Sequence, residues 1–497
     1  MDKHVIVIGG GLGGLFTGAI LAKEGCKVQI LEKNRTIGGG LQSFSRRGTF
    51  FDTGMHILGG LREGGNVYRI CKYLGISDKM AIHDNDHDCI DSITYLSDKT
   101  EIKVPEGKDA FINYFSKLFP HEKEGIRAYV NQLYNIANEV DLFCLRETKE
   151  LFKQYSEEFF LPADELIAKY IQDSKLRDML GYMNPMYGGM AGHSPAYIHA
   201  VINVLYISGS SHFVGDSQQM ADALKDVIVE SGGQVLTDKE VVRVATENKQ
   251  VLFVETKDGC LYKADYYVSD IHPYHLFKIC DSGSFPKSYR DRIEGLPSTF
   301  SSFSLYIILK KDTFPYINHT CYIQDDYGMV WDYNSYSSDW PRGLMYVTPE
   351  DENQGAYASR LIINCPMPFS AVDKWKDSVM GKRPKEYIEW KDEMKDRILD
   401  KISVCHPQIR SCISDIYTSS PLTIRDYYNT RDGSLYGIRK DSNDIASQVT
   451  VATKVKNLYL TGQNVNLHGI CGVPLTAIMT SEAIVGHNVV LEKINKA

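Results

Sequence analysis

Three glycines near the N-terminus have the spacing of a turn that binds a nucleotide diphosphate. Gly9, Gly11 and Gly14 form a G-x-G-x-x-G pattern between an apolar run, residues 4–8, and a segment whose apolar residues recur at helical spacing. Gly9 permits the tight turn, Gly11 lets a diphosphate approach the backbone, and Gly14 lets the helix pack on the strand. The amino end of that helix provides the positive end of a dipole for the phosphates.

An acidic residue follows where a bound ribose requires one. Residues 27–31 are predicted as a second strand, and Glu32 closes it about 20 residues beyond the glycine turn. A glycine-rich turn without a ligand is the alternative interpretation, but the strand, the helix and the acid together favour a dinucleotide. Because a carboxylate here disfavours a 2′-phosphate, we expect an NAD-like nucleotide or FAD rather than NADP.

Further segments resemble those of the superfamily of FAD-containing amine oxidases, phytoene desaturases, carotenoid isomerases and retinol saturases. They are residues 33–44 with a glycine run, 48–56 with Phe-Asp-Thr-Gly, 232–244 followed by 264–270, and 457–474. Their order and spacing extend over nearly the whole chain. In that family these segments approach the diphosphate and ribityl chain, the isoalloxazine, the adenine and the flavin ring, so the resemblance implies FAD.

The resemblance assigns cofactor contacts to residues far apart in the sequence. The predicted FAD-binding residues are Gly9, Gly11, Leu12, Gly13, Gly14, Glu32, Lys33, Gly39, Gly40, Leu41, Gly54, Met55, His56, Val241, Gly462, Gln463, Ile470 and Val473. The chain departs from the family at Gly40, where many relatives have an arginine, and in the last segment, which lacks the usual Pro-Gly-Gly-Gly run. A helix beginning near Val473 and Pro474 is expected to point its amino end at the flavin pyrimidine.

The fold class expected is α/β, with a Rossmann-like FAD-binding domain and an inserted α+β substrate domain. Residues 1–70, 215–295 and 415–497 are assigned to the discontinuous FAD-binding domain. Residues 71–214, which we expect to be mainly helical and aromatic, and residues 296–414 are assigned to the substrate-binding domain. In such folds the active site lies where the two domains meet at the flavin.

Flavin chemistry needs few protein side chains, because the N5 atom of the ring itself accepts or donates hydride. The resemblance implies an FAD-dependent oxidoreductase of the saturase, desaturase or isomerase type, acting on carbon–carbon double bonds of a polyene or isoprenoid lipid. The sequence does not choose among these three reactions. A flavin amine oxidase is one alternative. A non-catalytic prenyl-binding escort protein of the same fold is another, although the complete glycine set and Glu32 argue against it.

Two histidines are candidates for a place beside the flavin ring. His56 is the candidate catalytic residue, as a proton donor or as a hydrogen-bond partner of the ring, and a histidine that satisfies a buried carbonyl is the alternative. His468 in the last segment has the same two interpretations. The 31 tyrosines and 19 phenylalanines suit a tunnel for a long apolar substrate, although aromatic residues at helical spacing also form ordinary core.

Composition and charge exclude several classes of protein. A net charge of -8 without a Lys/Arg block argues against a nucleic-acid partner. The eleven cysteines are scattered and never spaced C-x-x-C, which favours a reducing compartment, and no metal site is predicted.

The chain has no apolar run long enough to span a bilayer, so the cytoplasm is the expected location. Peripheral membrane contact stays open, through apolar helices such as residues 111–119. The basic residues 381–385 form either a lipid contact or a solvated loop. The chain has no second nucleotide motif, so the electron donor is expected to be external and is not identified.

Overall fold

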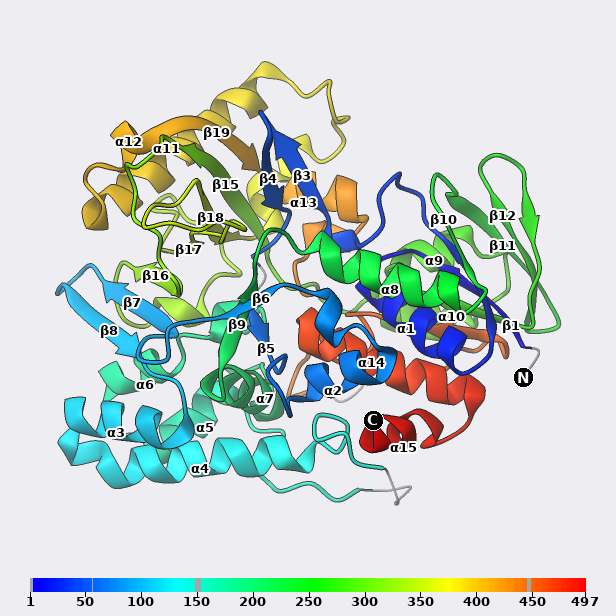
Figure 1. The fold of residues 1–497 in the computed structure, drawn as a ribbon, viewed down its shortest axis with the longest axis horizontal. Coiled ribbons are helices and arrows are strands. Elements are labelled where there is room, and N and C mark those ends of the chain that lie inside the picture. The colour runs from blue at the N-terminus through cyan, green and yellow to red at the C-terminus, as the bar shows by residue number, and fades with distance from the viewer. Residues whose placement is uncertain (1–2, 56, 148–152, 445–447) are drawn as a thin grey trace.

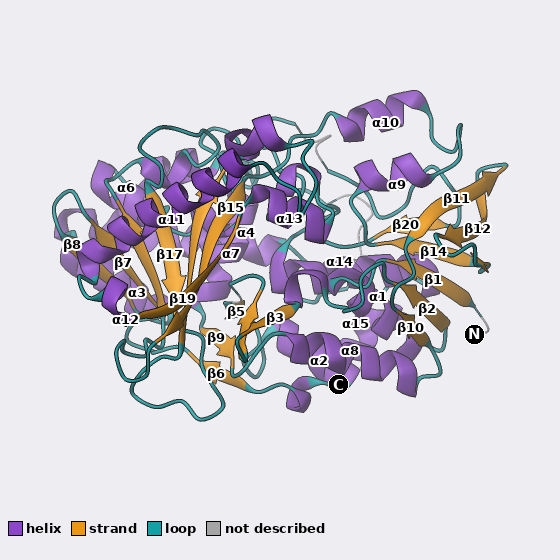
Figure 2. Cartoon of the chain, turned by 90° about the horizontal axis from the view of Figure 1, so that it is seen from above, coloured by secondary structure: helices purple, strands orange, loops and turns teal. Residues whose placement is uncertain are grey.

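The computed structural model describes residues 3–55, 57–147, 153–444 and 448–497. Two large sheets form the two halves of the molecule. A five-stranded sheet lies on the right of Figure 1 and a seven-stranded sheet on the left, and Figure 2 shows helix α14 between them. The mixed architecture confirms the α/β class that the sequence predicts, whereas the exact limits of the two domains stay a prediction.

The five-stranded sheet is parallel and assembles strands from four distant parts of the chain. Its order is β10 (Gln234–Leu236), β2 (Lys27–Leu31), β1 (His4–Ile8), β14 (Tyr266–Ser269) and β20 (Leu458–Leu460). The apolar residues of β1 are all buried, as in a parallel sheet covered on both faces. Since parallel strands end at one edge, the loops after β1, β2, β14 and β20 meet there.

Helices and a smaller sheet cover the two faces of this parallel sheet. On one side lie α1 (Leu12–Lys23), α8 (Gln218–Glu230) and α14 (Gly469–Val485). The other side carries a three-stranded sheet of β11 (Val241–Glu247), β12 (Gln250–Thr256) and β13 (Leu261–Tyr262), together with α9 (Pro273–Ile279) and α10 (Lys287–Glu294).

The seven-stranded sheet is antiparallel except for one pair of strands. Its order is β19 (Ile413–Ser419), β15 (Ser301–Leu309), β18 (Arg360–Met367), β17 (Gly343–Val347), β16 (Thr320–Gln324), β7 (Asp91–Tyr95) and β8 (Thr100–Val104), with β16 and β7 parallel. The long helix α11 (Lys385–Cys405) contributes to the core on one face. The two last strands come from the region that we expected to be mainly helical.

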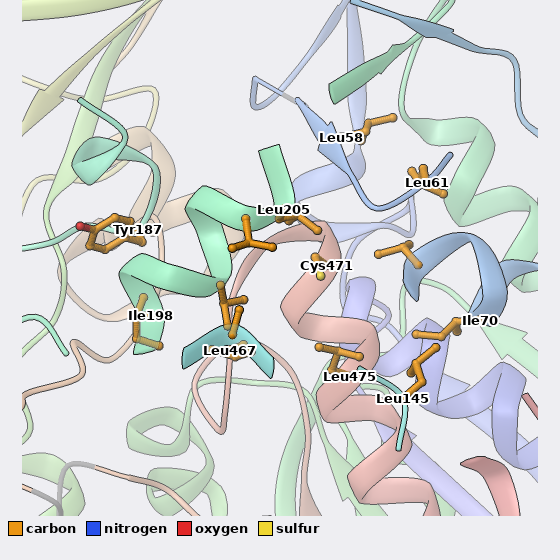
Figure 3. Close-up of a cluster of buried hydrophobic side chains, with 14 of the residues drawn as sticks. Leu58, Leu61, Ile70, Leu145, Tyr187, Ile198, Leu205, Leu467, Cys471 and Leu475 are labelled. Carbon is orange, nitrogen blue, oxygen red and sulfur yellow. The ribbon is translucent and has the colours of Figure 1, made fainter. Parts of the chain in front are cut away.

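A helical layer lies beside the sheets. It contains α3 (Lys108–Leu118), α4 (Lys123–Glu139), α5 (Ala163–Tyr170), α6 (Ser174–Leu180) and α7 (Ala196–Ile207). Figure 3 shows Ile198 and Leu205 of α7 facing Leu467 and Cys471 at the start of α14. This buried cluster joins the helical layer to the parallel sheet.

Two aromatic side chains of α3 are unavailable for membrane contact. Phe111 and Phe115 are 1 % and 0 % exposed, because this face of α3 packs in the core that it shares with α4. Leu118 at the end of α3 is 47 % exposed, so membrane contact through residues 111–119 stays a prediction. No helix within the described ranges combines the length and the apolar character that crossing a bilayer requires.

Short elements complete the fold. They are β3 (Ser43–Arg46), β4 (Thr49–Asp52), β5 (Leu58–Gly59), β6 (Ile82–Asp84), β9 (Ser210–Phe213), α2 (Asn66–Leu74), α12 (Ile409–Cys412), α13 (Pro421–Tyr428) and α15 (Val489–Lys496). The hairpin of β3 and β4 packs on the seven-stranded sheet, where Phe44 and Phe51 contact Tyr306. The chain that leaves this hairpin therefore runs between the two large sheets.

Candidate active site

One cavity of about 530 Å³ extends from the parallel sheet to the seven-stranded sheet. Its wall at one end is formed by the turn after β1 and by the loops after β2, β14 and β20. At the other end the wall is formed by β15, β16, β17 and β18, with residues of α7 and α13. The cavity therefore lies where the two sheets meet.

The glycine turn after β1 packs so closely against its neighbours that side chains have no space there. A Cβ atom at Gly13 would lie 2.3 Å from Oδ1 of Asp270 and 2.6 Å from the Cα of Gly462. A Cβ at Gly14 would lie 2.1 Å from the carbonyl oxygen of Gly9, so Gly14 permits close packing of helix on strand. Gly9 itself has φ +102°, a conformation that favours glycine.

Glu32 lines the cavity with its carboxylate fixed by backbone groups. The N–H of Gly10 donates to Oε2 at 2.7 Å, and the N–H of Asn34 donates to Oε1 at 2.8 Å. The residue is only 7 % exposed. Since each carboxylate oxygen has a second lone pair, Glu32 is able to accept hydrogen bonds from two ribose hydroxyls.

The second glycine segment packs directly on the first. The N–H of Gly38 donates to the carbonyl of Gly10 at 2.7 Å, and a Cβ at Gly39 would lie 3.1 Å from the Cα of Gly11. A Cβ at Gly40 would meet no atom within 4 Å, because this residue faces open space at the cavity wall. The two turns together form a continuous backbone surface without side chains.

The C-terminal segment closes the same end of the cavity. Thr461 at the end of β20 contacts Thr17 of α1, with 2.8 Å between their hydroxyl oxygens, and Gly462 lies against Gly13. Helix α14 begins at Gly469, so the expectation of a start near Val473 and Pro474 is wrong by about one turn. This earlier start requires a glycine at position 472, because a Cβ atom there would lie only 2.4 Å from the Cβ of Leu467.

Most predicted cofactor-binding residues converge on this cavity. Those in its wall are Gly9, Gly11, Leu12, Gly13, Glu32, Lys33, Gly39, Gly40, Leu41, Gly54, Met55, Val241, Gly462, Gln463, Ile470 and Val473. Gly14 is not in the wall, and His56 lies outside the described residues. His468 is also absent from the wall: burial lowers its pKa to about 4, and its ring lies 4.7 Å from that of Tyr436. Contact of these residues with a cofactor stays a prediction.

Asp270 is a site residue that the sequence did not single out. Its carboxyl group lies beside Gly11, Gly13 and Gly462. Burial raises its pKa to about 7, the Glu32 carboxylate adds to this rise, and the N–H groups of Gly14 and Gly11 oppose it. A signal was present, because Asp270 directly follows β14 and parallel strands end at the ligand-binding edge.

The opposite end of the cavity is rich in aromatic side chains, which the sequence also did not identify. They are Tyr206, Phe300, Tyr322, Tyr333, Tyr427, Tyr428 and Tyr436. Apart from Tyr427 and Tyr428, which are adjacent in α13, they come from separate elements and loops, so no spacing in the sequence links them. Burial raises the pKa of the phenols of Tyr206, Tyr322 and Tyr436, so these groups keep their protons at neutral pH.

Charge is distributed unevenly along the cavity. Among the described residues that line the cavity, those of the types Asp, Glu, Lys and Arg all come from elements around the parallel sheet. They are Glu32, Lys33, Lys239, Glu240, Asp270 and Lys278. The described residues that the seven-stranded sheet contributes are Ser302, Tyr322, Gln324, Leu344, Met345, Asn364 and Pro366. This second end is therefore polar in places but uncharged.

Comparisons with known proteins agree with this geometry. All-trans-retinol 13,14-reductase from Macaca fascicularis is 25 % identical over 532 residues, covering 97 % of this chain and 86 % of that protein. Chloroplastic prolycopene isomerase 2 from an Oncidium hybrid cultivar is 24 % identical over 523 residues, covering 97 % and 84 %. The crystal structure of an oxidoreductase from Methanosarcina mazei superimposes with a TM-score of 0.64 at 16 % identity, covering 96 % of this chain and 100 % of that one.

A family model gives the same result. Residues 12–342 match the model described as flavin containing amine oxidoreductase, which is more than half of the chain. The resemblance seen in the sequence and the expectation of an enzyme are thus confirmed. The chain belongs to the flavin-containing amine oxidoreductase family.

Proposed function

We propose that the flavin is FAD, bound along the cavity with its nucleotide part at the glycine turns. The fit rests on the backbone surface of the two glycine segments, on the positive end of α1 and on Glu32, whose fixed carboxylate suits a ribose. Residues near Val241 in β11 would hold the adenine. When bound, the flavin supplies an atom that accepts or donates hydride.

We propose that the substrate is a polyene or isoprenoid lipid whose carbon–carbon double bond is reduced, desaturated or isomerised. The observation that carries this proposal is the uncharged, aromatic end of the cavity. An apolar chain gains about 25 cal/mol for each Å² that such a wall removes from water. The relatives point the same way, because one is named a retinol reductase and another a prolycopene isomerase.

The residues at this end would orient the substrate and exclude water. Aromatic rings hold a flat conjugated chain in one plane. Gln324 and Asn364 provide hydrogen bonds for a polar end group, such as a hydroxyl. Burial raises the pKa of the Tyr322 phenol, so this group keeps its proton and would act as a hydrogen-bond donor to the substrate. His56 stays the predicted catalytic residue from sequence reasoning.

An amine oxidase is the second candidate, and the family name and the tyrosines favour it. Aromatic rings attract an ammonium group through their π faces. However, a buried ammonium also needs a carboxylate, and the carboxylates of the described wall lie at the nucleotide end. This distribution makes the amine a weaker candidate than the polyene.

A single experiment separates these possibilities. The purified holoenzyme is studied in two forms, one with its flavin chemically reduced in the absence of oxygen and one with its flavin oxidised. Both forms are mixed with retinol and with carotenes, and the oxidised form is also mixed with primary amines. Saturation by the reduced enzyme adds two hydrogens to a polyene, desaturation by the oxidised enzyme removes two, and isomerisation changes the chromatographic retention of the polyene without changing its mass. Formation of an aldehyde from an amine without any polyene product would overturn the proposal, as would inertness toward every polyene.

We also propose that peripheral contact with a membrane lets a lipid reach this cavity. Val379 and Met380 are 65 % and 53 % exposed on a loop that also carries exposed Lys382 and leads to the exposed Lys385 at the start of α11. The preceding turn packs against α13, whose Tyr427 lies in the cavity wall. Apolar tips flanked by lysines suit an anionic bilayer surface.

Flotation with vesicles tests this contact. The holoenzyme should float with vesicles that contain anionic lipid, and the double variant Val379→Ser/Met380→Ser should float less. Lack of flotation of the wild type with either anionic or neutral vesicles would exclude the contact.

A further inference from the structure

Three potential metal ligands from distant parts of the chain converge outside the flavin cavity. His83 of β6 and His212 of β9 are directly opposite each other in adjacent antiparallel strands. Glu350 follows β17. A β-bridge, in which the N–H of Gly215 donates to the carbonyl of Glu350 at 3.0 Å, holds Glu350 beside the two histidines. Sequence reasoning could not find this cluster, because no local spacing connects the three residues.

The ligand atoms are close enough to share one ion. Oε2 of Glu350 lies 2.7 Å from Nδ1 of His83 and 2.7 Å from Nε2 of His212. One ligand atom from each residue can be chosen so that all lie within 4.8 Å of one another. Zinc binds nitrogen and oxygen ligands at about 2.0–2.2 Å, so these side chains need only small rotations to surround it.

A second layer of hydrogen bonds orients His212 as a ligand. Its Nδ1 lies 2.8 Å from Oδ1 of Asn85, and the amide nitrogen of Asn85 donates to Oγ of Ser210 at 2.8 Å. This arrangement makes Nδ1 the donor of a hydrogen bond to the Asn85 oxygen. The neutral ring then directs the lone pair of Nε2 at Glu350, and a carbonyl-type partner of this kind is typical of metal-binding histidines.

The hydroxyl group of Tyr316 faces more hydrogen-bond acceptors than its single proton can satisfy. The hydroxyl oxygen of Tyr316 lies 3.2 Å from Nε2 of His212, 3.2 Å from Oε2 of Glu350 and 3.2 Å from Oδ1 of Asn318. The amide nitrogen of Asn318 donates elsewhere, so its oxygen is the atom that faces the phenol. One phenol proton cannot satisfy three acceptors, and a cation among them would remove the excess of lone pairs.

The exposure of the cluster is compatible with binding an ion. The side chain of His83 is 53 % exposed, so an ion can enter and a water can complete its coordination.

We propose that His83, His212 and Glu350 bind a divalent first-row transition-metal ion, with zinc as the representative case. Two imidazoles and one carboxylate select such an ion over magnesium or calcium. The ion would tie the strands β6 and β9 to the chain after β17 in the seven-stranded sheet. It would also stabilise a wall of the flavin cavity, because a smaller cavity beside it is lined by His212 and Tyr316 and shares Gly54 and Met55 with the large one.

Titration of the holoenzyme with zinc tests the proposal. The protein is purified without a histidine tag, in a Cys260→Ser background because Cys260 is an exposed thiol, and is dialysed against a chelator that is then removed. Calorimetry should show one zinc ion bound per chain, and zinc should raise the thermal transition. Zinc affinity should fall about 10- to 100-fold or more in His83→Ala, whose exposed position makes misfolding no concern, and in Glu350→Gln, which keeps the side-chain shape.

His87→Ala is the matched control. His87 is also exposed and also contacts a carboxylate, with 2.9 Å from its Nδ1 to Oε2 of Glu106, but it lies outside the three-residue cluster. The control should bind zinc like the parent protein. No zinc bound by the parent, or equal affinity in the parent and His83→Ala, would overturn the proposal and leave the cluster as a hydrogen-bonded link between strands.

Discussion

The two ends of the large cavity are built by different means. At the nucleotide end, backbone groups and missing side chains form the surface, as at Gly11, Gly13 and Gly39. At the opposite end, side chains such as Tyr322 and Met345 form it. Backbone surfaces would recognise the diphosphate, a part that every FAD molecule has, whereas side chains can change from one substrate to another. The comparison therefore predicts that variants at the two ends affect different measurements.

The largest effect is expected at the glycine turn. In Gly13→Val, the Cβ would lie 2.3 Å from the Asp270 carboxylate and 2.6 Å from the backbone of Gly462, so the cavity cannot keep its shape. The purified variant should be colourless, without the visible absorbance of flavin. Gly355→Ala is the control, because a Cβ there meets no atom within 4 Å. A yellow Gly13→Val protein with full flavin content would refute the assignment of this end.

A smaller loss is expected at the ribose position. Glu32→Gln removes a charged acceptor, and hydrogen bonds to charged groups contribute about 1.5–3 kcal/mol, which corresponds to about a 10- to 100-fold weaker FAD affinity. Turnover at saturating FAD should change little, since Glu32 is remote from the aromatic end. Titration of the apoprotein measures the affinity, with the exposed Glu247→Gln as control. Equal affinities of Glu32→Gln and wild type would show that no ribose binds there.

At the substrate end, an added charge should reduce turnover without loss of flavin. Met345→Asp places a carboxylate in the uncharged wall, and its desolvation opposes binding of an apolar chain. We expect kcat/KM for a polyene to fall about 10-fold, which corresponds to about 1.4 kcal/mol. The volume-conserving Met345→Leu should stay close to wild type. Improved oxidation of amines by Met345→Asp at unchanged polyene turnover would favour the alternative substrate.

The smallest effect concerns pH at the nucleotide end. Burial raises the pKa of Asp270 to about 7, so this group is neutral below pH 7 and negatively charged above it. An ionised Asp270 repels the diphosphate, and we expect FAD affinity to decrease about three- to tenfold from pH 6 to pH 8.

Asp91 provides the control for this titration. Burial also raises its pKa to about 7, but it is not in the cavity wall. Asp270→Asn should abolish the pH dependence of FAD affinity, and Asp91→Asn should preserve it. Identical pH profiles in wild type and Asp270→Asn would place the diphosphate away from Asp270.

The sequence predicted the nucleotide end well because its determinants are local. A strand, a glycine turn and a helix are adjacent in the chain, so residues 4–23 predict the β1–α1 unit directly. The later cofactor segments were found through their resemblance to a family. The start of α14 was misplaced, because Pro474 was taken to mark the first turn and lies instead in the second.

The aromatic end could not be predicted from one sequence. Tyr206, Tyr322 and Tyr436 are brought together only by tertiary packing, and each resembles an ordinary core tyrosine in its local context. The strands β7 and β8 were also missed, although they form a local hairpin and only the other partner of β7, strand β16, lies more than two hundred residues away along the chain. Asp270 was accessible in principle, since the end of a parallel strand is a place to search for ligands.

The contact between the first turn and the last strand has a consequence for biosynthesis. Gly13 lies against Gly462, and Thr17 against Thr461, so this end of the cavity is incomplete until residues 458–462 have left the ribosome. Cofactor loading must then follow the synthesis of β20, and a nascent chain that stops before β20 would expose the edge of β14 without a partner. Premature termination before β20 would therefore yield an apoprotein prone to aggregation rather than a partly active enzyme.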